Sequence, residues 1–162
     1  MLSRAARGNG ARPAVRRLYA LEHLCMGCTL CVVGCFVEHS RTKDILKAYL
    51  RESPRPVARL RVERRDGLFL PVQCRHCDEP YCVYSCLTGA LSRDPLTGEV
   101  LLDPERCIGC WTCILVCPYG AITRDRGRGV IAKCDLCPDR EVPACVAICP
   151  NQAIAYVEEQ TA

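Results

Sequence analysis

Residues 107–118 read Cys107-Ile108-Gly109-Cys110-Trp111-Thr112-Cys113-Ile114-Leu115-Val116-Cys117-Pro118. The four cysteines stand at gaps of two, two and three residues, and a proline follows the last one. This spacing is typical of thiolates that hold iron–sulfur clusters, and in two-cluster proteins the fourth cysteine binds the other cluster. Gly109 lets the backbone come close to an inorganic core. The step from Cys113 to Cys117 predicts one turn of helix, which Pro118 ends.

The same pattern occurs four times and uses all sixteen cysteines. Every run begins with C-x2-C and ends with C-x3-C, and only the middle gap varies. In chain order the runs are Cys25, Cys28, Cys31 and Cys35; Cys74, Cys77, Cys82 and Cys86; Cys107, Cys110, Cys113 and Cys117; and Cys134, Cys137, Cys145 and Cys149. Because no cysteine is left over, the sequence predicts four [4Fe-4S] clusters, each bound through iron by four thiolates.

The 162-residue chain is poor in the large side chains that fill an ordinary core. Apart from tyrosines, its aromatic residues are Phe36, Phe69 and Trp111. Domains with so little core usually depend on metals or disulfides. We therefore expect the clusters to act as the core, with folding coupled to cluster insertion.

Charge and hydropathy exclude several functions. The formal net charge is +4 with cysteines counted as neutral, and we expect the basic residues to offset the negative charge of clusters rather than to bind nucleic acid. No window approaches the roughly twenty apolar residues of a membrane span. Residues 1–17 are basic and lack the apolar segment of a signal peptide, so we expect a disordered arm and a cytoplasmic protein with reduced thiols.

Patterns between the runs predict short, irregularly spaced elements. The expected elements are a strand over 18–24, a helix-like insert over 36–53, hairpins that turn at 66–67, 95–98 and 124–129, and a strand over 153–157. After the last cysteine of runs two, three and four, a turn leads into a short strand. These repeats indicate an α+β fold of two pseudo-symmetric, bacterial dicluster ferredoxin-like units with short β-hairpins, small and built around the clusters.

Two pairings of the runs are compatible with this fold. Runs two and three are joined by a short segment, 87–106, and would form one unit over 57–117. Runs one and four would then form the other, over 18–56 plus 118–162, with the terminal strands meeting. The rival pairing joins run one to two and three to four, and the residues alone do not exclude it.

Under the first pairing, each run contributes its fourth cysteine to its partner's cluster. The ligand sets are then Cys25, Cys28, Cys31 and Cys149 (set 1); Cys134, Cys137, Cys145 and Cys35 (set 2); Cys74, Cys77, Cys82 and Cys117 (set 3); and Cys107, Cys110, Cys113 and Cys86 (set 4).

The chain resembles the four-cluster, ferredoxin-like electron-transfer subunits of oxidoreductase complexes, which serve molybdopterin enzymes, hydrogenases and carbon monoxide dehydrogenase. The resemblance runs from about Leu18 to Val157 and rests on the four runs together with three phrases: Cys74-Arg75-His76-Cys77, Cys107-Ile108-Gly109-Cys110-Trp111 and Lys133-Cys134-Asp135-Leu136-Cys137. It implies the first pairing of the runs. It also implies a catalytic oxidoreductase subunit as partner, with a flavin/NAD(P) oxidoreductase as a further candidate.

The compact length and the stretch Glu38-His39-Ser40 are most similar to the subunits attached to tungsten aldehyde oxidoreductase or carbon monoxide dehydrogenase, and the tungsten enzyme is slightly favoured. The chain shows no nucleophile–base set and no phosphate-binding fingerprint, so we expect no catalysis by the chain itself. The alternatives are a freestanding polyferredoxin carrier and a zinc-binding interaction module. Zinc suits two separated C-x2-C pairs better than three cysteines at three-residue intervals.

Several charged and aromatic residues lie beside the cysteines. The residues Arg75, Arg106 and Lys133 border cysteines, where a positive charge or an N–H donor would raise the reduction potential of a cluster. An ordinary solvated charge is an equal alternative. Because the cysteines already complete the ligand count, His23, His39 and His76 are expected beside the clusters or on the surface rather than as ligands.

Overall fold

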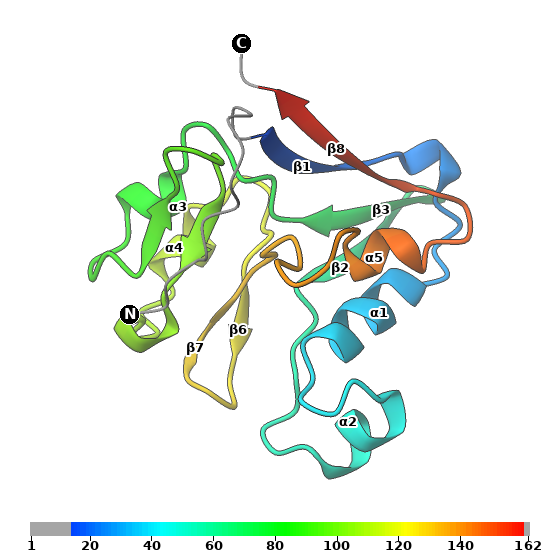
Figure 1. Cartoon of the computed structure of the whole chain (residues 1–162), viewed down its shortest axis with the longest axis horizontal. Helices are drawn as coiled ribbons and strands as arrows, with labels where there is room; N and C mark the ends of the chain where they lie inside the picture. The colour runs from blue at the N-terminus through cyan, green and yellow to red at the C-terminus, as the bar shows by residue number, and fades with distance from the viewer. Residues whose placement is uncertain (1–13, 161–162) are drawn as a thin grey trace.

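The computed structural model describes residues 14–160 and has an α+β fold of short elements (Figure 1). Within this range, the strands form four separate two-stranded antiparallel sheets, β1–β8, β2–β3, β4–β5 and β6–β7. The strands are β1 Ala14–Ala20, β2 Leu60–Arg65, β3 Leu68–Gln73, β4 Leu91–Arg93, β5 Val100–Leu102, β6 Thr123–Asp125, β7 Val130–Ala132 and β8 Ile154–Gln160. The helices are α1 Leu30–Glu38, α2 Ile45–Arg51, α3 Tyr81–Tyr84, α4 Thr112–Leu115 and α5 Ala144–Ala147, with 3-10 turns η1 Glu22–Leu24 and η2 Pro104–Arg106.

The first and last strands pair, as predicted. Leu18 lies opposite Tyr156, and Ala20 lies opposite Ile154. However, β1 begins at Ala14, so residues 14–17 belong to a strand and not to the expected arm; the rest of that arm lies outside the described residues. The reason is that Val15 is buried and the Arg16 guanidinium donates to the carboxylate of Glu99. Tertiary contacts therefore hold a basic segment that looks unstructured in the sequence.

The three predicted hairpins are present. Strands β2 and β3 meet at Asp66-Gly67, where both residues have positive φ, as a tight two-residue hairpin turn requires. Asp94 and Asp125 organise the other two turns, since each side chain accepts hydrogen bonds from backbone N–H groups two and three residues further on.

The helix-like insert differs from expectation because it is two helices. Helix α1 ends at Glu38, and α2 begins at Ile45. Between them, the carboxylate of Glu52 accepts the backbone N–H groups of Arg41 and Thr42, and Asp44 caps α2 by accepting the N–H of Lys47. These side-chain bonds offer the backbone a turn in place of a continuous helix.

The helices pack in two pairs. Helix α1 packs on α5, and α3 packs on α4; Figure 1 shows the two pairs on opposite sides of the molecule. Two groups of buried side chains lie inside. One surrounds Leu18, Leu136 and Ile154 and includes five cysteines, and the other surrounds Val100 and Ile131 and includes Cys113. Both interiors therefore depend on cysteine side chains.

None of the described helices combines the length and apolarity needed to cross a membrane.

Candidate iron–sulfur centres

Each cysteine run is built as a tight loop followed by a helix. The third cysteine of each run lies within a helix: Cys31 in α1, Cys82 in α3, Cys113 in α4 and Cys145 in α5. The loops contain residues with positive φ, namely Gly27, Thr29, His76, Gly109, Trp111, Leu136 and Cys137. When residues in this conformation alternate with residues of ordinary helical φ and ψ, their backbone N–H groups point toward one centre. This geometry is found at anion and iron–sulfur sites.

The cysteines of set 1 line one cavity. They are Cys25, Cys28, Cys31 and Cys149, which come from both ends of the described chain. Val62, Pro71 and Ile154 close the cavity with apolar surface, and about 330 Å³ around it is free of protein atoms. The cavity therefore presents four sulfur donors in a largely apolar lining.

Sets 3 and 4 each line a further cavity. One contains Cys74, Cys77, Cys82 and Cys117, with about 390 Å³ free of protein atoms. The other contains Cys107, Cys110, Cys113 and Cys86, with about 320 Å³. In both, three cysteines come from one run and the fourth from another, and the similar sizes suit one kind of occupant.

The cysteines of set 2 are all buried. Burial, together with the nearby thiols of Cys35 and Cys137, raises the pKa of Cys145 to about 12. Burial likewise raises the pKa of Cys137 to about 11 and that of Cys134 well above its usual range. These four cysteines thus lie close enough to influence one another.

Burial also dominates the thiol chemistry of the other sets. It raises the pKa of Cys31, Cys82 and Cys113 to about 11, and neighbouring thiols act in the same direction. At neutral pH such thiols keep their protons unless a metal displaces them. Cluster insertion at these positions would therefore release protons.

The last cysteine of each run accepts a backbone hydrogen bond. Ala121 donates to Cys117 Sγ (3.4 Å) and Ala153 donates to Cys149 Sγ (3.2 Å), each from four residues ahead. The N–H groups of Leu91, Thr88 and Ala90 lower the pKa of Cys86 against the opposing effect of burial. Run one differs, because α1 continues past Cys35. The backbone N–H of Arg59, from a distant segment, donates to Cys35 Sγ at 3.2 Å instead. Such donors stabilise a thiolate and tune a cluster's potential.

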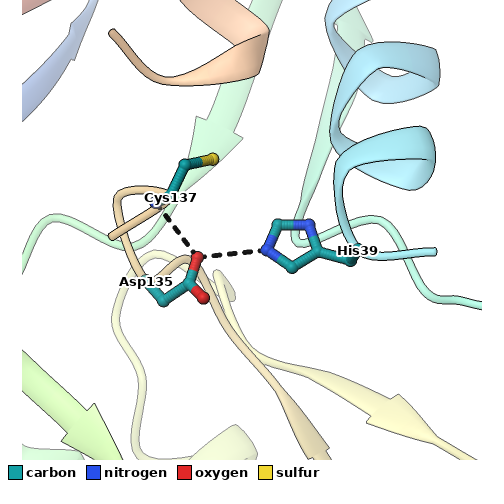
Figure 2. A group of neighbouring side chains, drawn as sticks. All are labelled: His39, Asp135 and Cys137. Atoms are coloured by element: carbon teal, nitrogen blue, oxygen red, sulfur yellow. Dashed lines mark hydrogen bonds and ion pairs between the residues drawn. The ribbon is translucent and has the colours of Figure 1, made fainter. Parts of the chain in front are cut away.

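A charged network borders set 2 (Figure 2). His39 Nε2 lies 3.1 Å from Asp135 Oδ1, which also accepts the N–H of Cys137, and Arg59 forms an ion pair with the same carboxylate. Burial alone would lower the pKa of His39, but its bonds to Asp135 and Cys35 raise it to about 9. His39, Asp135 and Cys137 lie close enough to hold a metal, yet Arg59 already neutralises Asp135 and Cys137 belongs to set 2. The network therefore supports set 2 and is not a separate site.

The buried ring N–H of His76 is suited to donate to a neighbouring sulfur atom. Its Nδ1 accepts the N–H of Val100 at 2.9 Å, so Nε2 carries the proton, and burial together with the charge of Lys133 lowers its pKa to about 2. Nε2 is buried and has no partner among residues 14–160. A buried N–H without a partner is costly unless something accepts it. His76 lies between Cys74 and Cys77, so a cluster held there would supply sulfur acceptors, and the residues present fit such a group.

The three cations singled out from the sequence differ in the structure. Arg75 is exposed and stacks on the ring of Tyr119, and Arg106 is exposed. Lys133 is buried. No sequence pattern singles out Arg59 or Glu99. Asp135 could have been noticed, because it is an acidic residue inside a C-x2-C loop.

A family model described as "4Fe-4S dicluster domain" matches residues 65–159. An "Iron-sulfur protein" of Rhodospirillum rubrum is 38% identical over 157 residues, covering 87% of this chain and 81% of the relative. The "Electron transport protein HydN" of Escherichia coli (strain K12) is 37% identical and covers 83% of each chain. The "Thiosulfate reductase electron transfer subunit PhsB" of Salmonella typhi is 34% identical, covering 83% of this chain and 71% of the relative.

The fold is similar to a chain in a solved structure entitled "Active site complex BamBC of Benzoyl Coenzyme A reductase as isolated". The TM-score is 0.52 at 22% identity, with 92% of this chain and 80% of that chain covered. At this identity the likeness concerns the fold alone.

Proposed function

Because the chain belongs to the 4Fe-4S dicluster family, we propose that its four cysteine sets hold four [4Fe-4S] clusters that relay electrons within an oxidoreductase complex. The chain is a non-catalytic iron–sulfur electron-transfer protein like its relatives, and its sixteen cysteines match four such clusters. The observation that carries the finer proposal is that three cavities are each lined by four cysteines, three from one run and one from another.

The proposed ligands are those of sets 1 to 4. The rival pairing of runs predicts different ligand sets, since Cys149 would then bind a cluster with the cysteines of run three, and Cys117 would bind one with the cysteines of run four. Instead Cys149 shares a cavity with Cys25, and Cys117 shares one with Cys74. The packing of α1 on α5 and of α3 on α4 supports the same pairing, because these helices carry the exchanged runs.

The proposed order of the relay is set 4, set 3, set 2, set 1. Neighbouring sets influence each other's thiols: Cys113 acts on Cys82, Cys74 on Cys134, and Cys31 on Cys145. Among the cysteines, Cys28 of set 1 and Cys110 of set 4 are exposed. We therefore place the entry and exit of electrons at these two ends, and sets 2 and 3, which contain no exposed cysteine, in the middle.

A [4Fe-4S] cluster accepts and releases one electron at a time. The residues of this chain fix the spacing of the thiolates, exclude water through Val62, Leu136 and Ile154, and donate N–H bonds to the thiolate sulfurs. Burial and these donors act in opposite directions on the potential, so each set is tuned by its own surroundings.

We further propose a catalytic oxidoreductase subunit as partner, because relatives include a thiosulfate reductase subunit and a phenylglyoxylate dehydrogenase subunit. Tungsten aldehyde oxidoreductase, or else carbon monoxide dehydrogenase, is the finer proposal and rests on the resemblance around Glu38-His39-Ser40. A freestanding carrier is the alternative. Native co-purification distinguishes them, since a carrier elutes alone, whereas a subunit elutes with a catalytic chain that accepts electrons from it.

Metal analysis tests the cofactor. Protein purified without oxygen should be brown and contain about sixteen irons and sixteen sulfides per chain, four of each for every cluster. Zinc in place of iron in a colourless, folded protein would contradict the proposal.

Single substitutions test the exchanged ligation. Cys117→Ala should abolish the same electron paramagnetic resonance signal as Cys77→Ala, because both residues belong to set 3. The matched control is Cys110→Ala, which changes a set 4 ligand in the same run as Cys117. If Cys117→Ala instead reproduced the spectrum of Cys110→Ala, the exchanged sets would be wrong.

A further inference from the structure

Lys133 is a buried cation at the boundary between the two groups of cysteine runs. Lys133 is 3% exposed and directly precedes Cys134 of set 2. The Nζ atom donates to the carbonyl oxygen of Cys134 at 2.7 Å and to the carbonyl oxygen of Val100 in β5. One ammonium therefore connects the loop of run four to the strand that lies between runs two and three.

Val100 continues this connection toward set 3. It is 1% exposed, it lines the cavity formed by set 3, and its N–H donates to His76 Nδ1. His76 lies inside the loop of run two, and the charge of Lys133 also acts on Cys82 of the same set. Lys133 thus lies beside set 2 and one residue away from the set 3 cavity.

The polypeptide gives this cation hydrogen bonds but no counter-charge. Both acceptors are neutral carbonyls, and no ion pair joins Lys133 to a carboxylate anywhere between residues 14 and 160. A buried ammonium without an opposite charge is strongly destabilising. The groups that can supply negative charge at this position are the thiolates of sets 2 and 3 and whatever they bind.

We propose that Lys133 is the counter-charge shared by sets 2 and 3 and that it raises the reduction potential of both clusters, at the step where electrons cross between the two helix pairs. This inference rests on the function proposed above. Reduction adds negative charge to a cluster, and a fixed positive charge in a low-dielectric interior stabilises the reduced form. Lys133 is a positioning and tuning residue, since no contact with a substrate is involved.

The other two cations beside cysteines serve as a comparison. Arg75 and Arg106 are exposed, and water and salt screen exposed charges. We therefore expect their removal to leave the potentials nearly unchanged, whereas Lys133 acts from inside the protein.

The test replaces Lys133 in the full, iron-loaded chain and measures the potentials of all four clusters by redox titration followed by electron paramagnetic resonance. Lys133→Gln keeps a hydrogen-bond donor and removes the charge. We expect two of the four potentials to fall, each by at least a tenfold change in the reduction equilibrium, which is about 59 mV for one electron. Lys133→Arg should keep the wild-type potentials, and Lys47→Gln on the exposed surface of α2 should shift none.

The outcomes are distinguishable from failure of the proposed function. Wild-type protein without iron would refute the four-cluster proposal itself. Full iron content with unchanged potentials in Lys133→Gln would overturn the role of Lys133 alone. If Lys133→Gln binds less iron, Lys133→Arg decides: full iron in Lys133→Arg supports a requirement for charge, and equal loss in both variants means that Lys133 only fills space.

Discussion

At the scale of single residues, Gly109 shows how a loop of run three is held against its surroundings. Its φ is +64°, and a Cβ at this position would lie 2.3 Å from the carbonyl oxygen of Gly129 in the β6–β7 turn. The sequence suggests that this glycine faces the inorganic core. The structure adds a second reason for it, the close approach of another backbone segment.

Substitution of Gly109 by alanine should therefore lower the free energy of unfolding by more than the backbone strain of a positive φ. Gly67 is the matched control, because it has φ +81° and open space where its Cβ would be. Gly67→Ala should lower the free energy of unfolding by about 1–2 kcal/mol, the usual cost of this conformation for a residue with a Cβ. Gly109→Ala should lower it further, since a backbone carbonyl must also move. Thermal unfolding of the iron-loaded variants measures both, and equal shifts would contradict the steric argument.

The candidate cysteine ligands can be proposed from the sequence because iron–sulfur chemistry requires one residue type at fixed spacing. The burial of Lys133 could not be predicted in the same way. Arg75, Arg106 and Lys133 all border cysteines and look equivalent along the chain, and only folding decides which is buried. The network of His39, Asp135 and Arg59 was hidden for the same reason, since Asp135 meets the other two only in the tertiary structure.

At the scale of elements, the hairpins were predictable and the insert was not. Turn residues at 66–67 fix a hairpin locally, so the sequence suffices. The insert over 36–53 is predicted to be helix-like from the apolar spacing within residues 44–50, but Glu52 reaches back across ten residues and accepts hydrogen bonds from the N–H and the hydroxyl of Thr42. A periodic pattern carries no information about such a return contact.

The Glu52 contact makes the insert sensitive to acid. Hydrogen bonds from Thr42, and then from Arg41, lower the pKa of Glu52 below its usual value. The stabilisation is therefore fully present above the ordinary carboxylate pKa of about 4.3 and is lost as the pH falls through the lower, folded-state value. Amide exchange at residues 41–52 should speed up over this acidic range relative to the β2–β3 hairpin.

Glu52→Gln is the matched variant for this prediction. It should show faster exchange in the insert already at neutral pH, and it should lose the additional acceleration in acid. An identical acid response in the variant would mean that another group causes it.

At the scale of the whole molecule, the interior depends on the groups that the cysteines hold. Five cysteines belong to one buried group, and Cys113 belongs to the other. The largest apolar side chains are few, and many are at the surface: Leu50 is 70% and Leu115 is 84% exposed. The apolar residues alone therefore provide little core.

Removal of iron should unfold most of the chain. With the metal gone, the buried thiols regain protons and the cavities they line lose their contents, so the two interiors collapse or fill with water. Anaerobic chelation followed by circular dichroism and amide exchange should show loss of protection in β7 and α5 as well as in the loops. A chelated, reduced protein that kept the unfolding midpoint of the loaded form would contradict a core built on clusters.

The cavity lined by Cys25, Cys28, Cys31 and Cys149 has a consequence for biosynthesis. A ribosome makes the first three of these residues long before the fourth, so under the proposed ligation this centre cannot be completed on a nascent chain until Cys149 has emerged. The proposed sets 3 and 4 require nothing beyond Cys117, and assembly machinery could load them while translation continues. The thiols made first are therefore the last to be protected, and during that interval they are the ones most open to oxidation or to the wrong metal.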